Sequence, residues 1–211
     1  MKCLLPALLF LLLTPGLSAQ ATALSFQLTT GLLANNYGRK DPQAVPSIQG
    51  AHWEFGAGLL VTRRTRTGWA GETGLFFGRR NLRMSYEVDT PEVVRQVTLN
   101  PTFLYLPLRL VFGGPNPQPR SEWQRGGNPG GYLGLGLRYN FLTTDDPAPL
   151  VRSVAANLGG RLVPDIHVGY RWTIRGLYLG FGGALPLRTT IRDYTFGEIS
   201  LNAFAGYTLP Y

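Results

Sequence analysis

The chain has 211 residues, which without a leader peptide make one domain rather than two. Its formal net charge of +8 comes almost wholly from arginine, since only Lys2 and Lys40 are lysine. A charge of this size can indicate a nucleic-acid partner, but an exported chain with no recognisable nucleic-acid module is not expected to bind nucleic acid. An arginine-rich envelope protein is expected to meet lipid phosphates or acidic polysaccharide instead.

The N-terminus has the three parts of a secretory signal peptide. Lys2 supplies the positive charge, residues 4–13 form an apolar run, and Leu17-Ser18-Ala19 ends it with small residues. We therefore predict a cleaved signal peptide over 1–19 and one barrel domain over 20–211. The only cysteine, Cys3, leaves with the leader, so the mature chain has no disulfide. No later segment approaches the roughly 18 apolar residues of a membrane-spanning helix.

The rest of the chain alternates between apolar and small or polar residues, as strands do. We expect about eight strands, near residues 24–33, 53–61, 69–78, 94–112, 132–141, 165–172, 177–185 and 199–211. The alternation changes phase near Arg79, which predicts either a bulge or a strand leaving the membrane. Pro101 and Pro107 each remove a hydrogen-bond donor and predict local weakness in the fourth strand.

Alternation alone fits a soluble, lipocalin-like barrel as well as a membrane barrel. Three features favour the membrane: glycine crowds the polar face, aromatic residues gather near the ends of the apolar face, and the chain stops on its last strand. The predicted fold class is therefore all-β, an antiparallel up-and-down transmembrane β-barrel. Connections 63–68 and 173–176 are short and expected in the periplasm, whereas 35–47 and 143–153 are longer and expected outside. The long segment 113–130 is an exception. Successive connections alternate between the two sides of the membrane, and this order places the segment in the periplasm.

The C-terminus carries Gly206, Leu209 and Tyr211 in the spacing Gly-x-x-apolar-x-aromatic. This ending resembles the signal by which bacterial outer-membrane barrels are recognised and inserted. It implies the barrel assembly machinery as a partner and the cell outer membrane as the location.

Several short motifs resemble the PorT-like outer-membrane β-barrel family of Bacteroidota, which are small OmpA-like barrels of eight strands. The motifs are Tyr105–Leu108, Gly134–Gly136, Gly206–Tyr207 and the cleavage site Ser18–Gln20. The resemblance implies a structural or interaction role at the cell envelope. One family member takes part in protein secretion, so periplasmic or secretion-system proteins are further expected partners.

The polar face carries charged residues that should project into the lumen. They are Glu54, Glu72, Arg109, Arg138, Asp165, His167, Arg171 and Glu198. An eight-stranded barrel is just wide enough for side chains to fill it. Because an unpaired charge away from water is costly, these groups should pair and plug the lumen. A small-solute channel is the alternative.

Enzymatic and metal chemistry have little support in the sequence. Some small outer-membrane barrels modify lipid A with a His-Ser-acid constellation, but no serine lies between His52 and Glu54. His167 is expected to be a hydrogen-bonded filler between Asp165 and Gly169. No paired His or Cys spacing is present for a metal, and we expect no enzyme activity and no cofactor.

Arg79, Arg80 and Arg83 follow the apolar stretch of the third strand. The alternation of strand directions places this cluster at the outer rim, at the height of lipid A phosphates. The planar guanidinium binds two phosphate oxygens at once, so the cluster is expected to contact lipopolysaccharide. A solvated extension of the strand is the alternative.

Overall fold

The structure is a computed structural model that describes residues 19–39, 47–65, 69–88, 90–113, 128–141, 152, 162–174, 176–187, 190–191 and 194–209. The strands are β1 (Ala19–Arg39), β2 (Ser47–Thr65), β3 (Ala70–Arg80), β4 (Leu82–Val88), β5 (Thr90–Leu99), β6 (Thr102–Gly113), β7 (Asn128–Phe141), β8 (Leu162–Ile174), β9 (Leu177–Pro186), β10 (Thr190–Ile191) and β11 (Tyr194–Thr208). No helix within these ranges is long and apolar enough to cross a membrane.

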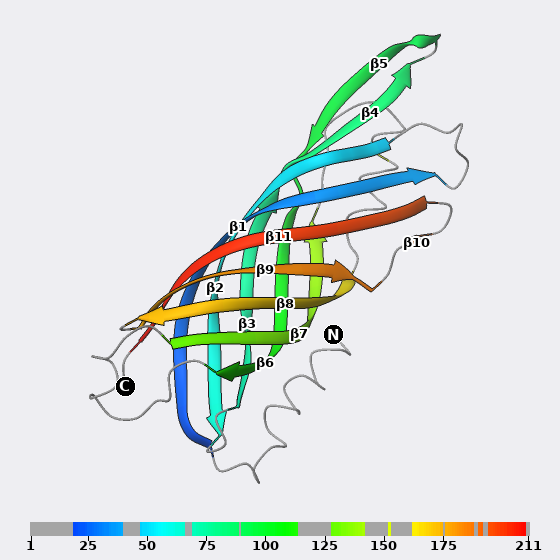
Figure 1. The fold of residues 1–211 in the computed structure, drawn as a ribbon. Helices are drawn as coiled ribbons and strands as arrows, with labels where there is room; N and C mark the ends of the chain where they lie inside the picture. Colours follow the sequence, from blue (N-terminus) through cyan, green and yellow to red (C-terminus); the bar gives the residue numbers. More distant parts are fainter. Residues whose placement is uncertain are drawn as a thin grey trace.

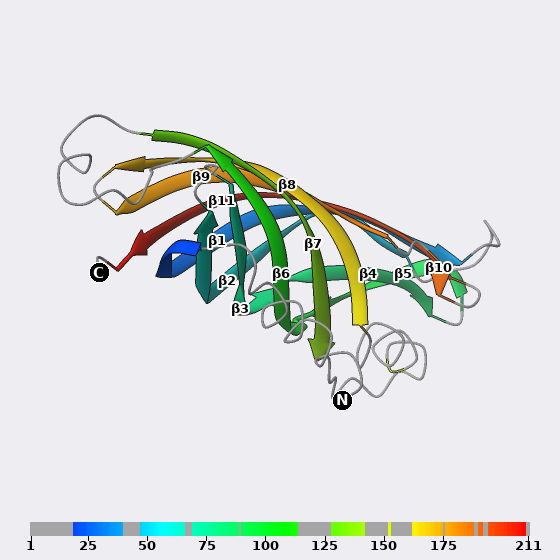
Figure 2. The same cartoon turned by 90° about the horizontal axis from the view of Figure 1, so that it is seen from below.

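Eight of these strands close into a barrel (Figures 1 and 2). Neighbours follow the order β1-β11-β9-β8-β7-β6-β3-β2, and β2 pairs back onto β1, so the ladder has no free edge around the wall. Each of these pairings is antiparallel. The predicted all-β, antiparallel up-and-down barrel of eight strands is confirmed.

The apolar face of the barrel points outward. Leu201 and Phe181 are 63% and 66% exposed, whereas the polar residues between the apolar ones are buried inside. The soluble, lipocalin-like alternative requires the opposite arrangement and is excluded. Along β8, outward apolar side chains extend over 13 residues. At about 3.3 Å per residue and a tilt of about 40°, this band rises roughly 30 Å, close to the thickness of a bilayer core.

The two ends of the barrel differ in their connections. We call the end where β8 meets β9 the turn end, and the end where β3 meets β4 the loop end. Gly113 pairs with Gly130, so the predicted exception 113–130 does join β6 to β7 at the turn end. Its residues 114–127, residues 40–46 and most of 143–153 from the predicted long loops, and most of the predicted leader lie outside the described residues. The predicted bounds of the loop 35–47 are wrong, because β1 continues to Arg39 and β2 begins at Ser47, with the two strands still paired beyond residue 35.

Exposed aromatic side chains lie near both ends of the band. Trp69, Trp172 and Tyr207 are exposed near the turn end, and Trp53 and Phe141 near the loop end. Membrane barrels carry such aromatic girdles at both interfaces. Tyr211, the aromatic residue at the C-terminus, lies outside the described residues.

The wall continues past the loop end as a hairpin of β4 and β5 (Figure 1). Inward and outward side chains alternate without interruption from β3 into β4. Gly78, Arg80 and Leu82 are buried, whereas Arg79 and Arg83 are exposed. What changes is the residue type, because apolar residues such as Leu82 now point inward. The strand therefore leaves the apolar band, as one of the two predicted alternatives requires, and the β2–β3 register contains no bulge.

Both predicted prolines interrupt pairing. The segment expected as one strand over 94–112 is in fact two, β5 and β6, separated at Asn100 and Pro101. Within β6, the ladder to β3 skips from Thr73–Leu108 to Phe76–Tyr105, across Pro107. The Thr73 hydroxyl donates to the Pro107 carbonyl at 2.9 Å and bridges this gap.

Candidate functional site

Strand register brings most of the predicted lumen charges together. Glu72 on β3 lies directly opposite Arg109 on β6, and Arg109 lies opposite Gly134 on β7, which in turn pairs with His167 on β8. Glycine at the intermediate position lets the long side chains of the two flanking strands meet over it. The site is thus a band of inward side chains around β3, β6, β7 and β8.

Glu72 is the centre of this network. Its Oε1 accepts a hydrogen bond from Arg109 Nη1 at 2.9 Å, and its Oε2 accepts one from Arg171 Nη1 at 2.7 Å. The Thr62 hydroxyl also donates to Oε2, at 3.1 Å. The Glu72 side chain is fully buried. One carboxylate therefore joins two guanidinium groups, and Arg171 reaches it from β8 across the lumen.

Glu54 pairs with Arg80, which was predicted to lie at the outer rim. Arg80 Nε donates to Glu54 Oε2 at 3.1 Å, and both side chains are almost fully buried. The prediction that Arg80 lies at the outer rim with Arg79 and Arg83 is therefore wrong. Adjacent residues of a strand point to opposite faces, so Arg79 and Arg80 cannot share one. Arg79 and Arg83 are both exposed, on the outer face.

His167 lies in a three-way contact with Asp165 and Tyr105. Its Nδ1 is 3.2 Å from Asp165 Oδ1 and 2.6 Å from the Tyr105 hydroxyl, which itself donates to Asp165 Oδ1 at 3.0 Å. On the other side of the ring, Arg109 Nε donates to His167 Nε2 at 3.4 Å. An acceptor at Nε2 places the ring proton on Nδ1. This arrangement fixes the imidazole as a link between Asp165 and Arg109.

The interior also contains aromatic rings, whose packing in the lumen was not predicted from the sequence. They are Phe76, Phe103, Tyr105, Tyr132, Tyr178 and Phe204. Arginines lie over several of them: Arg109 is 4.5 Å from the Tyr132 ring centre, Arg138 is 5.3 Å from that of Phe103, and Arg171 is 5.6 Å from that of Tyr178. Cation–π contact thus supplements the ion pairs.

Inward glycines make room for these rings. A Cβ at Gly169 would overlap Tyr132, one at Gly180 would overlap Phe204, and one at Gly206 would overlap Tyr178. The sequence contains a pattern that could have predicted this packing. Each of these rings lies on the polar face of its strand, with a glycine two residues away or on a neighbouring strand. The lumen glycines accommodate aromatic rings as well as charged side chains.

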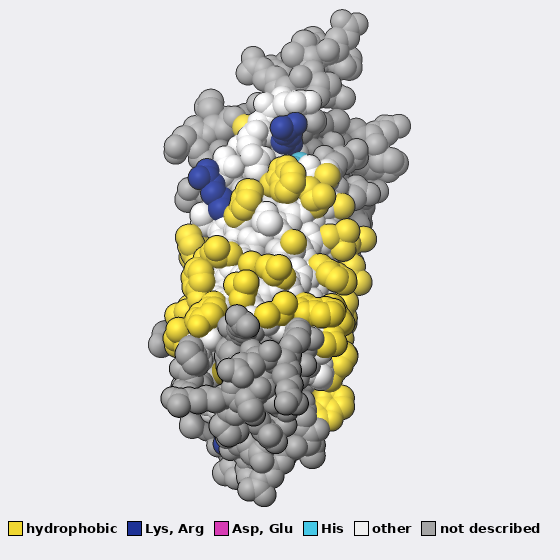
Figure 3. Space-filling model, turned by 60° about the vertical axis from the view of Figure 1, so that its left-hand side comes forward, with side chains coloured by type: hydrophobic (Ala, Val, Ile, Leu, Met, Phe, Trp, Pro, Cys, Tyr) yellow, Lys and Arg dark blue, Asp and Glu magenta, His cyan; other side chains and the backbone are white. Residues whose placement is uncertain are grey.

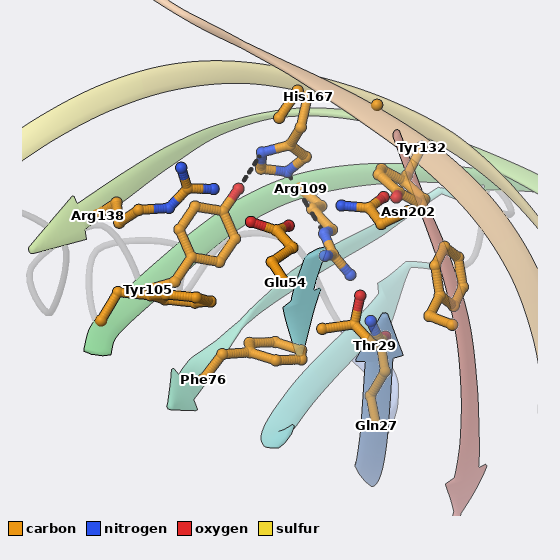
Figure 4. Close-up of a pocket in the computed structure, with 14 residues that line it drawn as sticks. Gln27, Thr29, Glu54, Phe76, Tyr105, Arg109, Tyr132, Arg138, His167 and Asn202 are labelled. Carbon is orange, nitrogen blue, oxygen red and sulfur yellow. Dashed lines mark hydrogen bonds between the residues drawn. The ribbon is translucent and has the colours of Figure 1, made fainter. Parts of the chain in front are cut away.

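One cavity lined by described lumen residues has a volume of about 40 Å³ (Figure 4). Its lining includes Glu54, Tyr105, Arg109, Arg138 and His167, and in Figure 4 these polar ends converge from several strands. A water molecule needs about 10–15 Å³ measured in this way, so the cavity has room for a few water molecules. It is too small for a sugar or an amino acid.

The remaining predicted site residues fall into two groups. Gly206 on β11 pairs with Gln27 on β1 and with Tyr178 on β9. The N–H of the exposed Leu209 donates to Leu24 O at 2.8 Å. Gly206 and Leu209 therefore lie where β11 meets β1, at the seam that closes the barrel. The side chain of Glu198, and Tyr211 as a whole, lie outside the described residues. Both therefore stay predictions.

The histidines and carboxylates of the described residues form no cluster of three or more that could hold a metal ion. His52 Nδ1 accepts a hydrogen bond from the backbone N–H of Arg83 at 3.2 Å. His52 is buried at the base of the β4–β5 hairpin, whereas His167 lies in the lumen network.

Enlarging Gly169 will test the fit between glycines and rings. We expect Gly169→Val to lower the free energy of unfolding by about 1–3 kcal/mol, as overpacking does, because its side chain would overlap Tyr132. Gly71→Val is the matched control, since nothing lies within 4 Å of a Cβ there. The double variant Gly169→Val with Tyr132→Leu should recover part of the loss. Equal effects of the two valines in urea unfolding would contradict the packing.

No protein-family model and no curated protein matches the chain. Among solved structures, the chain is similar to Neisserial surface protein A (NspA), with 8% identity, a TM-score of 0.47, and coverage of 91% of this chain and 100% of that one. It is also similar to Ail, the attachment invasion locus protein of Yersinia pestis, solved with the heparin analogue sucrose octasulfate. Here identity is 12% and the TM-score 0.34, with coverage of 88% of this chain and 99% of that one.

Proposed function

We propose that this protein is an outer-membrane β-barrel with a sealed lumen, which acts as a structural or interaction protein of the cell envelope. The observation that carries the proposal is a filled, charge-paired interior inside an apolar outer surface. Such an outer surface fits the apolar interior of a lipid bilayer, because in a closed barrel the strands of the wall pair with one another and leave no free edge.

The closed interior favours an interaction role over transport. Glu72, Arg109 and Arg171 cross the lumen as one bonded unit, and buried rings fill the levels around it. The cavity that the described lumen residues line admits only water-sized molecules. A solute could pass only if these ion pairs separated, and separating buried charges is costly.

The loop end is where a partner would be met. There β10, β11, β1, β2, β4 and β5 continue as one sheet beyond the barrel wall (Figure 1). Together with the resemblance to the PorT-like family, this extension supports a finer proposal: the barrel is an accessory of protein secretion that contacts secretion-system proteins at the outer surface. Deleting the gene in its own bacterium should then reduce secreted protein without changing outer-membrane permeability to small solutes. Unchanged secretion would refute the accessory role.

Conductance in planar bilayers tests the sealed lumen. We expect the folded wild-type protein to insert, as scored by heat-modifiable migration and protease protection, and to give no steady single-channel steps. The variant Glu72→Ala with Arg109→Ala and Arg171→Ala, which removes the ion pairs that cross the lumen, is the positive comparison and should conduct more than the wild type. Steady steps from the wild type would instead support the small-solute channel.

A further inference from the structure

Two exposed arginines lie just beyond the apolar band at the loop end. Outward residues along β3 run from Leu75 and Phe77, which are 54% and 58% exposed, directly to Arg79. Arg83 follows on the same face at the start of β4, with Asn81 between them. We call Arg79 and Arg83 the rim pair. Figure 3 shows basic side chains bordering the hydrophobic band in this way.

The charges of the described barrel are separated between its two faces. Its acidic side chains, Glu54, Glu72 and Asp165, are each at least 97% buried and are bonded within the lumen. Among the residues whose side chains the structure describes, no acidic group lies on the outer surface, and Figure 3 shows none on that face. An anion that meets the rim pair is therefore not opposed by a described surface carboxylate.

The surroundings of the rim pair are those of a membrane interface. Arg79 lies opposite Phe55 on β2, and the Phe55 ring stacks on that of Trp53 at 6.5 Å. Arg83 lies opposite the exposed Thr98 on β5, outside the apolar band. Aromatic rings with polar neighbours are typical of the headgroup level, where an exposed guanidinium is both hydrated and close to lipid phosphates.

The spacing of the rim pair fits one headgroup layer. Four residues along a strand span about 13 Å, which at a tilt of about 40° gives roughly 10 Å along the membrane normal. The polar layer on each side of a bilayer is about 5–8 Å thick, and arginine side chains reach beyond their own Cα atoms. Both guanidinium groups can thus meet phosphates of the same leaflet, each through a bidentate fork.

We propose that Arg79 and Arg83 form a binding site for the phosphate groups of anionic lipid in the outer leaflet. The site rests on the proposed membrane insertion, which puts the loop end at the outer surface. Asn81 and Thr98 add hydrogen-bonding groups beside the two guanidinium groups. Arg80 is not part of the site, because its guanidinium is bonded to Glu54 in the lumen.

The experiment compares thermal unfolding in vesicles that contain lipopolysaccharide with unfolding in vesicles that contain the same lipopolysaccharide after enzymatic removal of its phosphates. We expect the wild type to unfold at a higher temperature in the phosphorylated vesicles. Arg79→Gln with Arg83→Gln should lose more than half of that difference. Arg63→Gln is the matched control, since Arg63 faces outward at the opposite rim and should retain the difference. Added salt should reduce the difference for the wild type.

The outcomes separate this site from the proposed function. Heat-modifiable migration scores insertion independently, so a wild type that does not insert refutes the membrane barrel itself. If the protein inserts and the rim-pair variant keeps the full difference, the phosphate site is refuted while the barrel stands. The same result follows if Arg63→Gln loses as much as the rim-pair variant, because the effect would then be general surface charge.

Discussion

Replacing Glu72 with glutamine is expected to lower the free energy of unfolding by about 3–5 kcal/mol, the usual result of removing one partner from a buried ion pair. The change keeps the size of the side chain but removes its charge. Arg109 and Arg171, which donate to Glu72 at 2.9 and 2.7 Å, would then remain in the lumen without their carboxylate. Urea unfolding of the folded barrel in lipid vesicles measures the effect.

Two variants show whether the loss comes from charge. Among the described ion pairs, Glu54 bonds Arg80 whereas Glu72 bonds two arginines, so Glu54→Gln should cost less than Glu72→Gln. Neutralising the centre as a whole, with Glu72→Gln, Arg109→Gln and Arg171→Gln, should cost less than Glu72→Gln alone, because no unpaired charge remains. A loss below about 0.5 kcal/mol for Glu72→Gln, typical of an exposed site, would contradict a buried, sealed network.

The second large effect is expected at the closing seam. Replacing Leu209 and Tyr211 together by alanine should prevent assembly and leave unfolded, protease-sensitive protein in the periplasm. The reason is twofold: the sequence predicts that these residues are the assembly signal, and Leu209 N–H bonds to Leu24 O on β1 at 2.8 Å, where β11 completes the barrel. Heat-modifiable migration of outer-membrane fractions measures folding.

Leu187→Ala is the matched control for the seam. Leu187 is also an exposed leucine directly after a strand, and its N–H bonds to Pro164 O at 2.8 Å, but it lies at the loop end. We expect this variant to assemble normally. Normal assembly of the Leu209 and Tyr211 variant would show that the C-terminal pattern is not an assembly signal in this chain.

Alternation along the sequence was sufficient to predict the barrel. A period of two places Leu133 and Leu135 on one face and Arg138 on the other, whatever the neighbouring strands do. The same rule shows why the rim prediction was wrong for Arg80. Arg80 was grouped with Arg79 because the two are adjacent in the sequence, but adjacent residues of a strand point to opposite faces.

The partners of the lumen charges could not be predicted in the same way. They depend on the stagger between strands, which alternation does not give. Arg171 meets Glu72 across the lumen although the two are 99 residues apart, and nothing local distinguishes this pair from Arg138 with Glu72. The inward rings were missed for a different reason: alternation places Tyr132 and Phe204 on the polar face, but the glycines of that face were interpreted only as space for charged side chains, so no packing of rings was predicted.

The measurement that tests the account most directly is a spin-label accessibility scan of β1 in vesicles. It uses single cysteines at residues 26–30 and 32 in a Cys3→Ala background, since Cys3 is the only cysteine of the sequence. Oxygen reports contact with lipid, and a water-soluble nickel complex reports contact with water. We expect high oxygen and low nickel accessibility at Phe26, Leu28, Thr30 and Leu32, and low accessibility to both reagents at Gln27 and Thr29, which line the small cavity. Nickel accessibility at Gln27 and Thr29 would mean an open aqueous lumen, and nickel accessibility at Leu28 would mean that the apolar face is not in lipid; either result would contradict a sealed membrane barrel.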